Sequence, residues 1–272
     1  MRIAKTCLLL IGLMFLSLLG EAPAAEDKVK PVYKIGVARR AFLPPEPYNW
    51  RGAENRALVS AIWYPADSNS VEQPQWIGSP EFPFASAGRA APKASVSAAP
   101  HRFPLIVLSH GTGGSAMMMA WLGTRLAAHG FIAVAVNHPG NNALEKYTVE
   151  GFTLWWERAK DLSTVIDQVL VDSVFGDRID ANRIGAAGFS LGGYTMIEIA
   201  GGISTLFRFR EFCTSSQADR MCASIPEFPD LRAKAEALAR SDRQFAAALG
   251  QAGNSYRDPR VRAVFALDYW IG

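Results

Sequence analysis

The sequence predicts a single α/β domain, built on a mainly parallel sheet with helices on both faces, and three observations support this prediction. Its 272 residues are 49% hydrophobic and 19% charged, a composition typical of one globular domain. Short apolar runs alternate with segments of helical periodicity. Three of the apolar runs end in turns that contain glycine, histidine or serine. Because active sites in such sheets lie at the carboxyl ends of the strands, these turns are candidates for the functional site.

The predicted elements follow one another in an alternation of strands and helices. Strands are predicted from apolar and β-branched runs at residues 33–37, 58–64, 105–108, 131–136, 183–189 and 261–267. Helices are predicted from apolar spacing at residues 116–129, 155–171 and 191–200, and Gly130 is expected to end the first of them. Residues 65–104 are dense in Pro, Ala, Ser and Gly, so we expect most of this segment to be loop.

The first residues have the features of an export signal. Arg2 and Lys5 precede a short apolar run, and small residues suit cleavage after Ala24. We therefore expect residues 1–24 to be removed and residues 25–272 to form an exported domain, periplasmic or secreted. This apolar run is too short to span a bilayer, and no second run of that length follows, so no transmembrane anchor is predicted. Removal of Arg2, Lys5 and Glu21 with the signal changes the net charge from +3 to +2 (3 − 2 + 1), which is too close to neutral to predict a nucleic-acid or membrane-surface partner.

Residues 202–257 interrupt the alternation and are predicted to form an inserted cap over the site. The alternative is an ordinary surface excursion with no part in substrate binding. The segment contains Cys213 and Cys222, and in an oxidising compartment we expect a disulfide between them. Two unpaired thiols are the alternative. A metal site is not expected, because no histidine or further cysteine lies nearby, and nothing in the pattern implies an organic cofactor.

The most informative stretch is Gly188-Phe-Ser190-Leu-Gly192-Gly193. The pattern Gly-x-Ser-x-Gly between a strand and a helix is typical of a nucleophile elbow, a tight turn that exposes a reactive serine. Side chains at Gly188 or Gly192 are expected to collide with neighbouring backbone. The alternative is an unreactive glycine-rich turn, because the pattern by itself can arise by chance. Its position beside the other strand-end turns favours Ser190 as a nucleophile.

Acyl transfer to a serine requires hydrogen-bond donors for the negatively charged oxygen of the tetrahedral intermediate. The N–H of Leu191, the residue after the nucleophile, is the first expected donor. The second is expected in the turn at residues 110–114, where we choose the N–H of Thr112. A phosphate-binding loop is the alternative for this turn and is weaker, because the lysine of a P-loop is absent.

A nucleophilic serine also needs a histidine base, which follows the serine along the chain in this fold class. The four histidines, His101, His110, His129 and His138, all precede Ser190. His110 and His138 lie at strand ends, but they are better explained as a loop-orienting side chain and as part of a Pro-Gly turn. His101 and His129 are weaker candidates still. The base is therefore not present in the region where it is expected.

Asp268 is the expected acid, since it closes the last strand downstream of the serine, where an acid that orients an imidazole belongs. A helix cap is the alternative role for an aspartate at this place. Asp161, Asp167 and Asp172 lie on or near a predicted helix, and we expect them to be solvated charges.

Four segments together resemble the α/β hydrolases: Ser109-His-Gly-Thr-Gly-Gly114, Asn137-His-Pro-Gly140, Arg158-Ala-Lys-Asp-Leu162 and the stretch around Ser190. More narrowly, the chain resembles the bacterial dienelactone-hydrolase-related group, which is similar to the platelet-activating-factor acetylhydrolases. The resemblance covers residues 32–270, and Phe265-Ala-Leu-Asp268-Tyr-Trp270 is similar to the acetylhydrolase segment that bears the catalytic aspartate. It implies Ser190 as the nucleophile, Asp268 as the acid, and Thr112 and Leu191 as the oxyanion donors.

Two departures limit what the resemblance implies. Dienelactone hydrolases have a cysteine where this chain has Ser190, so their substrate is not transferred. The family also continues past the last predicted strand into two further strands and a loop that bears a histidine. We therefore expect this chain to be truncated at its C-terminus.

These observations predict an exported serine hydrolase of short-chain carboxylic esters that acts through an acyl-enzyme. Acetyl or oxidised acyl groups on a phospholipid are candidate substrates, and a small-molecule or lipid ester is the expected partner. A second hypothesis is a catalytically inactive fragment that lacks the histidine base. A third is a polyester- or peptide-cleaving enzyme of the same fold.

Overall fold

The computed structural model of the chain describes residues 32–79, 81–219 and 222–267. The expected export signal at residues 1–24 and the expected acid Asp268 lie outside the described residues. None of the helices within the described ranges has the length and apolar character required to cross a membrane.

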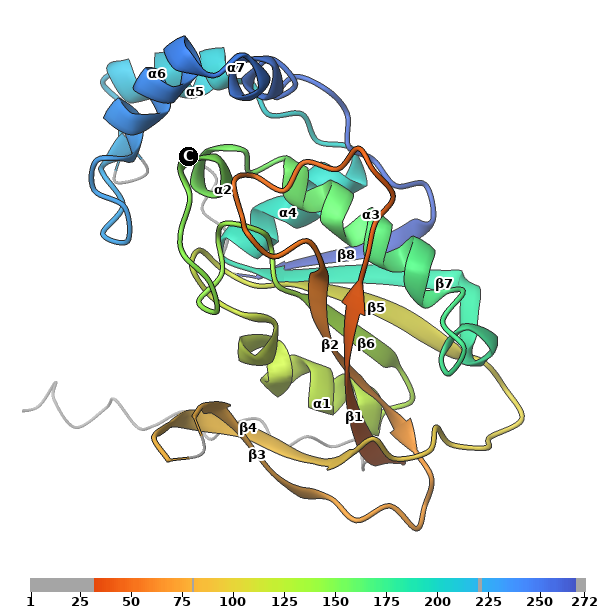
Figure 1. Ribbon diagram of the computed structural model, residues 1–272. Coiled ribbons are helices and arrows are strands. Elements are labelled where there is room, and N and C mark those ends of the chain that lie inside the picture. The colour runs from red at the N-terminus through yellow and green to blue at the C-terminus, as the bar shows by residue number, and fades with distance from the viewer. Residues whose placement is uncertain (1–31, 80, 220–221, 268–272) are drawn as a thin grey trace, which may run out of the picture. The chain divides into compact units, whose positions relative to one another are not determined.

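The sheet has eight strands in the order β3-β4-β1-β2-β6-β5-β7-β8 (Figure 1). Strands β6, β5, β7 and β8 run parallel to one another, and β2 runs antiparallel to both β6 and β1. The strands span Lys34–Phe42 (β1), Leu58–Ala66 (β2), Gln73–Gly78 (β3), Pro83–Pro92 (β4), Phe103–Ser109 (β5), Ile132–Val136 (β6), Ile179–Phe189 (β7) and Val261–Leu267 (β8). The mostly parallel sheet confirms the predicted α/β class, and every predicted strand is present.

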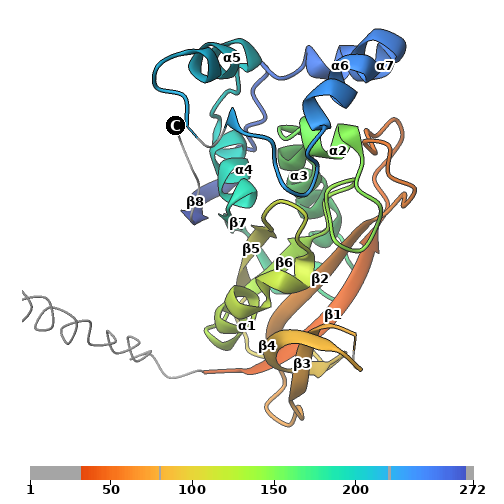
Figure 2. The ribbon, with the colours of Figure 1, turned by 90° about the vertical axis from the view of Figure 1, so that its left-hand side faces the viewer.

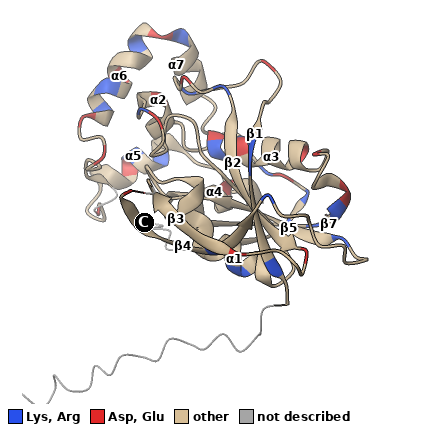
Figure 3. Cartoon of the chain, turned by 60° about the horizontal axis from the view of Figure 1, so that its bottom comes forward, with Lys and Arg blue, Asp and Glu red and all other residues tan. Residues whose placement is uncertain are grey.

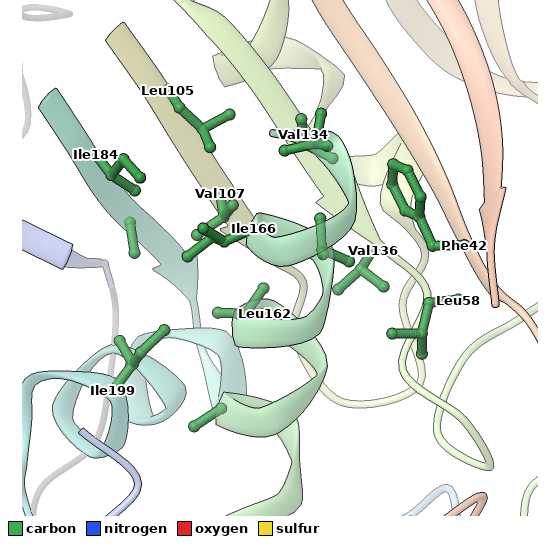
Figure 4. Close-up of a cluster of buried hydrophobic side chains, with 14 of the residues drawn as sticks. Phe42, Leu58, Leu105, Val107, Val134, Val136, Leu162, Ile166, Ile184 and Ile199 are labelled. Carbon is green, nitrogen blue, oxygen red and sulfur yellow. The ribbon is translucent and has the colours of Figure 1, made fainter. Parts of the chain in front are cut away.

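Helices cover both faces of the sheet. One face carries η1 (Ala116–Met119) and α1 (Ala120–Ala128), and the other carries α3 (Glu157–Val169) and α4 (Leu191–Ala200). The short α2 (Val149–Thr153) precedes α3, and η2 (Gly176–Arg178) follows it. Figure 4 shows Ile166 of α3 beside Val107 of the sheet, with Leu162 one turn further along the helix in the same core. Every residue of β6 is buried, as expected for a central strand with helices on both sides.

The prediction of a loop over most of residues 65–104 is wrong, because this segment forms β3 and β4. These strands pair antiparallel with each other, and β4 extends the sheet by pairing with β1. The small residues that suggested a loop serve in packing, since Ala87 and Ala90 are buried and β4 contacts α1. Gly88 has φ 83°, a left-handed conformation that favours glycine. The composition therefore reflects a close approach of strand and helix.

Residues 202–257 contain α5 (Leu206–Thr214), α6 (Leu231–Ser241) and α7 (Arg243–Leu249). Figures 1 and 2 show these helices on the side that carries α2, and α6 packs against α2 and α7. Basic and acidic residues both occur along α6 (Figure 3). A disulfide joins Cys213 to Cys222, and Phe245 of α7 is buried in the main core. The segment is thus attached to the core and closed on itself by the disulfide.

A cluster of buried polar side chains joins α3 to the turns after β5 and β6. Asp161 of α3 is fully buried and accepts hydrogen bonds from Arg51 Nη2 at 2.6 Å and from His138 Nδ1 at 2.7 Å. The hydroxyl of Tyr48 also donates to Asp161. On its other side, His138 Nε2 accepts from the hydroxyl of Ser109 at 2.8 Å. The expectation that Asp161 is a solvated charge is therefore wrong, because its partners come from distant loops and no spacing within the helix reveals them.

The other two acids near this helix differ from each other. The side chain of Asp167 is 62% exposed and pairs with Arg260, as expected of a surface charge. Asp172 is largely covered, pairs with Arg40 at 2.7 Å, and accepts from the backbone N–H of Val174 at 2.9 Å. Asp172 is therefore a structural residue of the turn after α3, which corrects the expectation of a solvated charge.

Substitution of Asp161 by Asn is expected to lower the free energy of unfolding by about 3–5 kcal/mol, because it leaves the buried guanidinium of Arg51 without a counter-charge. Urea unfolding at neutral pH measures the change. Asp167→Asn is the matched control, since the same substitution on the same helix breaks an exposed pair worth only about 0.2–1 kcal/mol. Equal losses in the two variants would contradict the role assigned to the buried charge.

The stability of the fold is also expected to depend on pH. Burial, reinforced by the positive charge of Arg158, holds the pKa values of His110 and His138 well below the usual value, so both are neutral in the folded protein. In the unfolded chain the pKa of histidine is about 6.5, so below that pH the unfolded state binds more protons and stability falls. The loss approaches about 1.4 kcal/mol per pH unit for each histidine.

Urea unfolding at a series of pH values between 7.5 and 5 tests this dependence. His138→Gln is expected to reduce the slope below pH 6.5 by about 1.4 kcal/mol per pH unit, because one of the two buried histidines no longer titrates. A slope that is the same in the variant and the parent chain would rule out a contribution from His138.

Candidate active site

Ser190 lies in the turn between β7 and α4, with backbone angles of φ 54° and ψ −120°. A residue other than glycine with positive φ is strained, and such strain is found at functional sites. The N–H of Ser190 donates to the carbonyl of Leu267 at 2.9 Å, and its own carbonyl accepts from the N–H of Gly193 at 2.7 Å. The backbone of the serine is thus held from two sides, by β8 and by α4.

Gly188 and Gly192 allow the backbone segments around Ser190 to approach closely. A Cβ at Gly188 would lie 2.0 Å from the carbonyl oxygen of Gly192, and a Cβ at Gly192 would lie 2.0 Å from the carbonyl oxygen of Ser109. No side chain fits at either position. Strands β5 and β7 and helix α4 therefore meet at Ser190 because both residues are glycine.

The turn after β5 lies directly against the serine. A Cβ added to Gly111 would be 3.2 Å from the Cβ of Ser190. Leu191 is the first residue of α4, where backbone N–H groups have no acceptor within the helix. Within the part of the chain that the structure describes, the N–H groups of Thr112 and Leu191 make no hydrogen bond. The two segments that flank Ser190 thus each contain an unpaired donor.

Neither His110 nor His138 has a free ring nitrogen. Both nitrogens of His138 are bonded, one to Asp161 and the other to Ser109. His110 donates from Nδ1 to the carbonyl of Gly111 at 2.7 Å, and its Nε2 accepts from the N–H of His138 at 3.3 Å. Both rings therefore hold the turns together, and neither has a nitrogen available for the hydroxyl of Ser190.

The other two histidines belong to different parts of the fold. His101 Nε2 lies 3.3 Å from the hydroxyl of Tyr33, in the loop before β5. His129 follows α1 as its C-terminal cap. Among the described residues, no histidine is hydrogen-bonded to Ser190.

The predicted acid, Asp268, is preceded by a residue that contacts the elbow. Leu267 ends β8, pairs with Phe189 of β7, and accepts the hydrogen bond from the N–H of Ser190. The described chain therefore reaches the backbone of Ser190 at the position just before Asp268.

Two residues that sequence reasoning missed hold the turn after β5. Asn141 Oδ1 accepts from the N–H of Gly113 at 2.7 Å. The hydroxyl of Tyr147 donates to the carbonyl of Gly113 at 3.2 Å. The position of Asn141, directly after the strand-end turn that contains His138, marks it in the sequence as a candidate residue near the site. Nothing in the sequence indicates that its partner is Gly113.

Aromatic side chains connect residues 202–257 to this region. The ring of Tyr147 is 4.8 Å from that of Phe152, which lies 5.5 Å from Phe228, centroid to centroid. The ring of Trp155 is 5.6 Å from that of Phe209 of α5. The segment before α3 therefore lies between the turn after β5 and the helices of residues 202–257.

Two cavities lie away from Ser190. A cavity of about 510 Å³ lies between α3 and the segment after α7, and one of about 460 Å³ lies beside the turn after β6. Ser190 lines neither of them. Over residues 32–79, 81–219 and 222–267, no group of three or more His, Cys, Asp or Glu side chains is arranged to hold a metal ion.

Comparison with known proteins gives matches to esterases. The family described as platelet-activating factor acetylhydrolase, isoform II, matches residues 84–153. Cutinase est2 of Thermobifida alba is 34% identical over 97 residues, which cover 35% of this chain and 29% of the cutinase. Lipase 1 of Moraxella sp. (strain TA144) is 31% identical over 86 residues, which cover 32% of this chain and 24% of the lipase. The matches thus span less than a third of the length of these relatives.

A solved ferulic acid esterase from Streptomyces cinnamoneus aligns with a TM-score of 0.49 and 26% identity, over 73% of this chain and 59% of that chain. The family match at residues 84–153 includes the turns after β5 and β6. The narrower likeness to dienelactone hydrolases stays a prediction. The mostly parallel sheet with helices on both faces has the architecture of the α/β-hydrolase fold, and the matched segments of the chain are similar to esterases.

Proposed function

We propose that the protein is a carboxylic ester hydrolase in which Ser190 is the nucleophile. The observation that supports this most directly is the strained backbone of Ser190 beside Gly111. That geometry presents a hydroxyl next to two segments with unpaired N–H donors, at Thr112 and Leu191. The similarity to cutinases favours an ester as the substrate.

The proposed reaction passes through an acyl-enzyme. Ser190 Oγ attacks the carbonyl carbon of the ester, and the carbonyl oxygen takes up the negative charge. The N–H groups of Thr112 and Leu191 stabilise this oxyanion, and each such donor lowers the barrier by about 3 kcal/mol. The C–O bond then breaks, the alcohol leaves with a proton, and the acyl group stays on Ser190. Water attacks the acyl-enzyme, which releases the acid and restores the hydroxyl.

The base and the acid complete this proposal. Asp268 is proposed as the acid, supported by the contact of Leu267 with Ser190. The base takes the proton from Ser190 and stands between the serine and the acid. Because both nitrogens of His110 and of His138 are already bonded, neither ring is proposed as the base.

Residues 202–257 are proposed to form a cap over the site. Residues 1–24 are proposed to be an export signal. The cap is supported by the packing of Phe228 on Phe152 and of Phe209 on Trp155, next to the turn after β5. Export is supported by the disulfide in this segment, which suits an oxidising compartment. The substrate is proposed to be a short-chain ester, including acetyl or oxidised acyl groups on a phospholipid, which agrees with the acetyl group in the name of the matched family.

The 272-residue chain is expected to hydrolyse p-nitrophenyl acetate no faster than its Ser190→Ala variant, because both ring nitrogens of the two strand-end histidines, His110 and His138, are already hydrogen-bonded to other groups. Added imidazole is expected to restore hydrolysis that depends on Ser190, since it supplies a base of suitable pKa in solution. Release of p-nitrophenol, followed by absorbance over a series of imidazole concentrations, measures both effects.

The Ser190→Ala variant at the same imidazole concentration corrects for the reaction of imidazole with the ester. Equal rates for the two proteins at every concentration would exclude Ser190 as the nucleophile. Turnover that depends on Ser190 without imidazole would instead assign the base to His110 or His138.

A polyester-cleaving activity is the second candidate, favoured by the similarity to cutinases. A series of p-nitrophenyl esters from acetate to palmitate, assayed with imidazole, distinguishes a short-chain esterase from a polyester-cleaving enzyme. A short-chain esterase is expected to lose rate steeply beyond butyrate. Comparable rates on long acyl chains, with release of monomers from a polyester film, would favour the polyester substrate.

A further inference from the structure

The backbone of the turn after β5 is held by polar groups on its carbonyl side. The carbonyl of His110 accepts from Arg158 Nη1 at 2.8 Å, and the carbonyl of Gly111 accepts from His110 Nδ1 at 2.7 Å. The N–H of Gly114 also donates to the carbonyl of Gly111, at 3.2 Å. In a trans peptide the carbonyl and the N–H point in opposite directions. Fixing the carbonyl of Gly111 therefore fixes the direction of the N–H of Thr112.

The peptide on the other side of Thr112 is held by Asn141. Its Oδ1 accepts from the N–H of Gly113 at 2.7 Å, which is the shortest hydrogen bond to an N–H of this turn. Gly113 has φ 60°, a left-handed conformation that glycine adopts without strain. Thr112 thus lies between two fixed peptide groups, while its own N–H is unpaired among the described residues.

Asn141 is itself rigidly placed. Its side chain is buried, with 1% of the residue exposed, and its Nδ2 donates to the carbonyl of Gly151 in α2 at 3.2 Å. A Cβ at Gly151 would lie 2.3 Å from the carbonyl carbon of Gly140, so α2 packs directly on the turn that precedes Asn141. The oxygen and the nitrogen of the Asn141 side-chain amide are therefore bonded to the turn after β5 and to α2, respectively.

We infer that Asn141 is a positioning residue for the oxyanion site, which holds the Thr112–Gly113 peptide so that the N–H of Thr112 faces the developing charge. The inference rests on the proposed function, in which Thr112 is a donor. Loss of an oxyanion donor costs about 10²–10³-fold in kcat, and it acts on the transition state more than on the bound substrate. A donor that is displaced and not removed is expected to cost about 10–100-fold.

The test compares Asn141→Ala with Asn142→Ala. Asn142 is its neighbour in the same turn and is also buried. It donates to the carbonyl of His138 at 2.9 Å and to Glu145 Oε1 at 2.6 Å, and among the described residues it makes no hydrogen bond to residues 110–114. Asn141→Ala is expected to lower the kcat of the imidazole-supported, Ser190-dependent hydrolysis by about 10–100-fold with KM unchanged. Asn142→Ala is expected to leave kcat within about threefold of the parent chain, although it also loses stability.

Amide hydrogen exchange at Gly113, followed by NMR, gives a second readout that does not depend on turnover. The exchange rate is expected to rise at least about tenfold in Asn141→Ala and to stay unchanged in Asn142→Ala. If Asn141→Ala does not fold, Asn141→Ser replaces it, because the shorter polar side chain cannot reach Gly113 and is expected to raise the exchange rate in the same way.

The outcomes separate the inference from the proposed function. An unchanged exchange rate at Gly113, or equal kcat losses in the two alanine variants, would overturn the role of Asn141. A parent chain with no Ser190-dependent rate would overturn the proposed function, and the exchange rate at Gly113 would still decide whether Asn141 holds the turn.

Discussion

The close approach of backbone segments at Ser190 is the constraint on which the rest of the structure depends. Side chains at Gly188 and Gly192 would each come within 2.0 Å of a carbonyl oxygen, so β5, β7 and α4 can meet only around two glycines. The strain of a serine at positive φ is maintained because β8 and α4 hold its backbone from both sides. The convergence of these segments brings the turn after β5 against Ser190. The two glycines therefore determine how β5, β7 and α4 meet at this edge of the sheet.

Buried charged side chains hold the turns next to Ser190. Asp161 and Arg51 form a buried pair, and His138 links Asp161 to Ser109 at the end of β5. Buried pairs of this kind add little net stability compared with an apolar core, but they impose one arrangement, because every other arrangement leaves a charge without a partner. We suggest that this cluster serves the precision of the turns more than the stability of the fold. The histidines at the strand ends are part of this framework, and that accounts for their presence near a site in which they have no free nitrogen.

The fold class and the identity of the elbow could be predicted from the sequence, because both depend on short-range patterns. Apolar runs alternating with helical periodicity indicate buried parallel strands wherever they occur, and Gly-x-Ser-x-Gly describes a turn whose steric requirements are local. The two strands within residues 65–104 could not be predicted, for the opposite reason. The alanines of β4 lack the β-branched signature of a strand, and they serve in the contact of β4 with α1, which only the folded chain reveals.

The sequence by itself therefore determined the alternation of the central strands and helices, the position of the nucleophile candidate and the cysteines available for pairing. Tertiary structure alone decided that Asp161 is buried with Arg51, that both strand-end histidines are fully bonded, and that Asn141 holds Gly113. The physical reason is the range of the interactions. Steric and periodic preferences act between residues close in sequence, whereas a buried charge or amide is defined by partners that the chain brings together from tens to more than a hundred positions away.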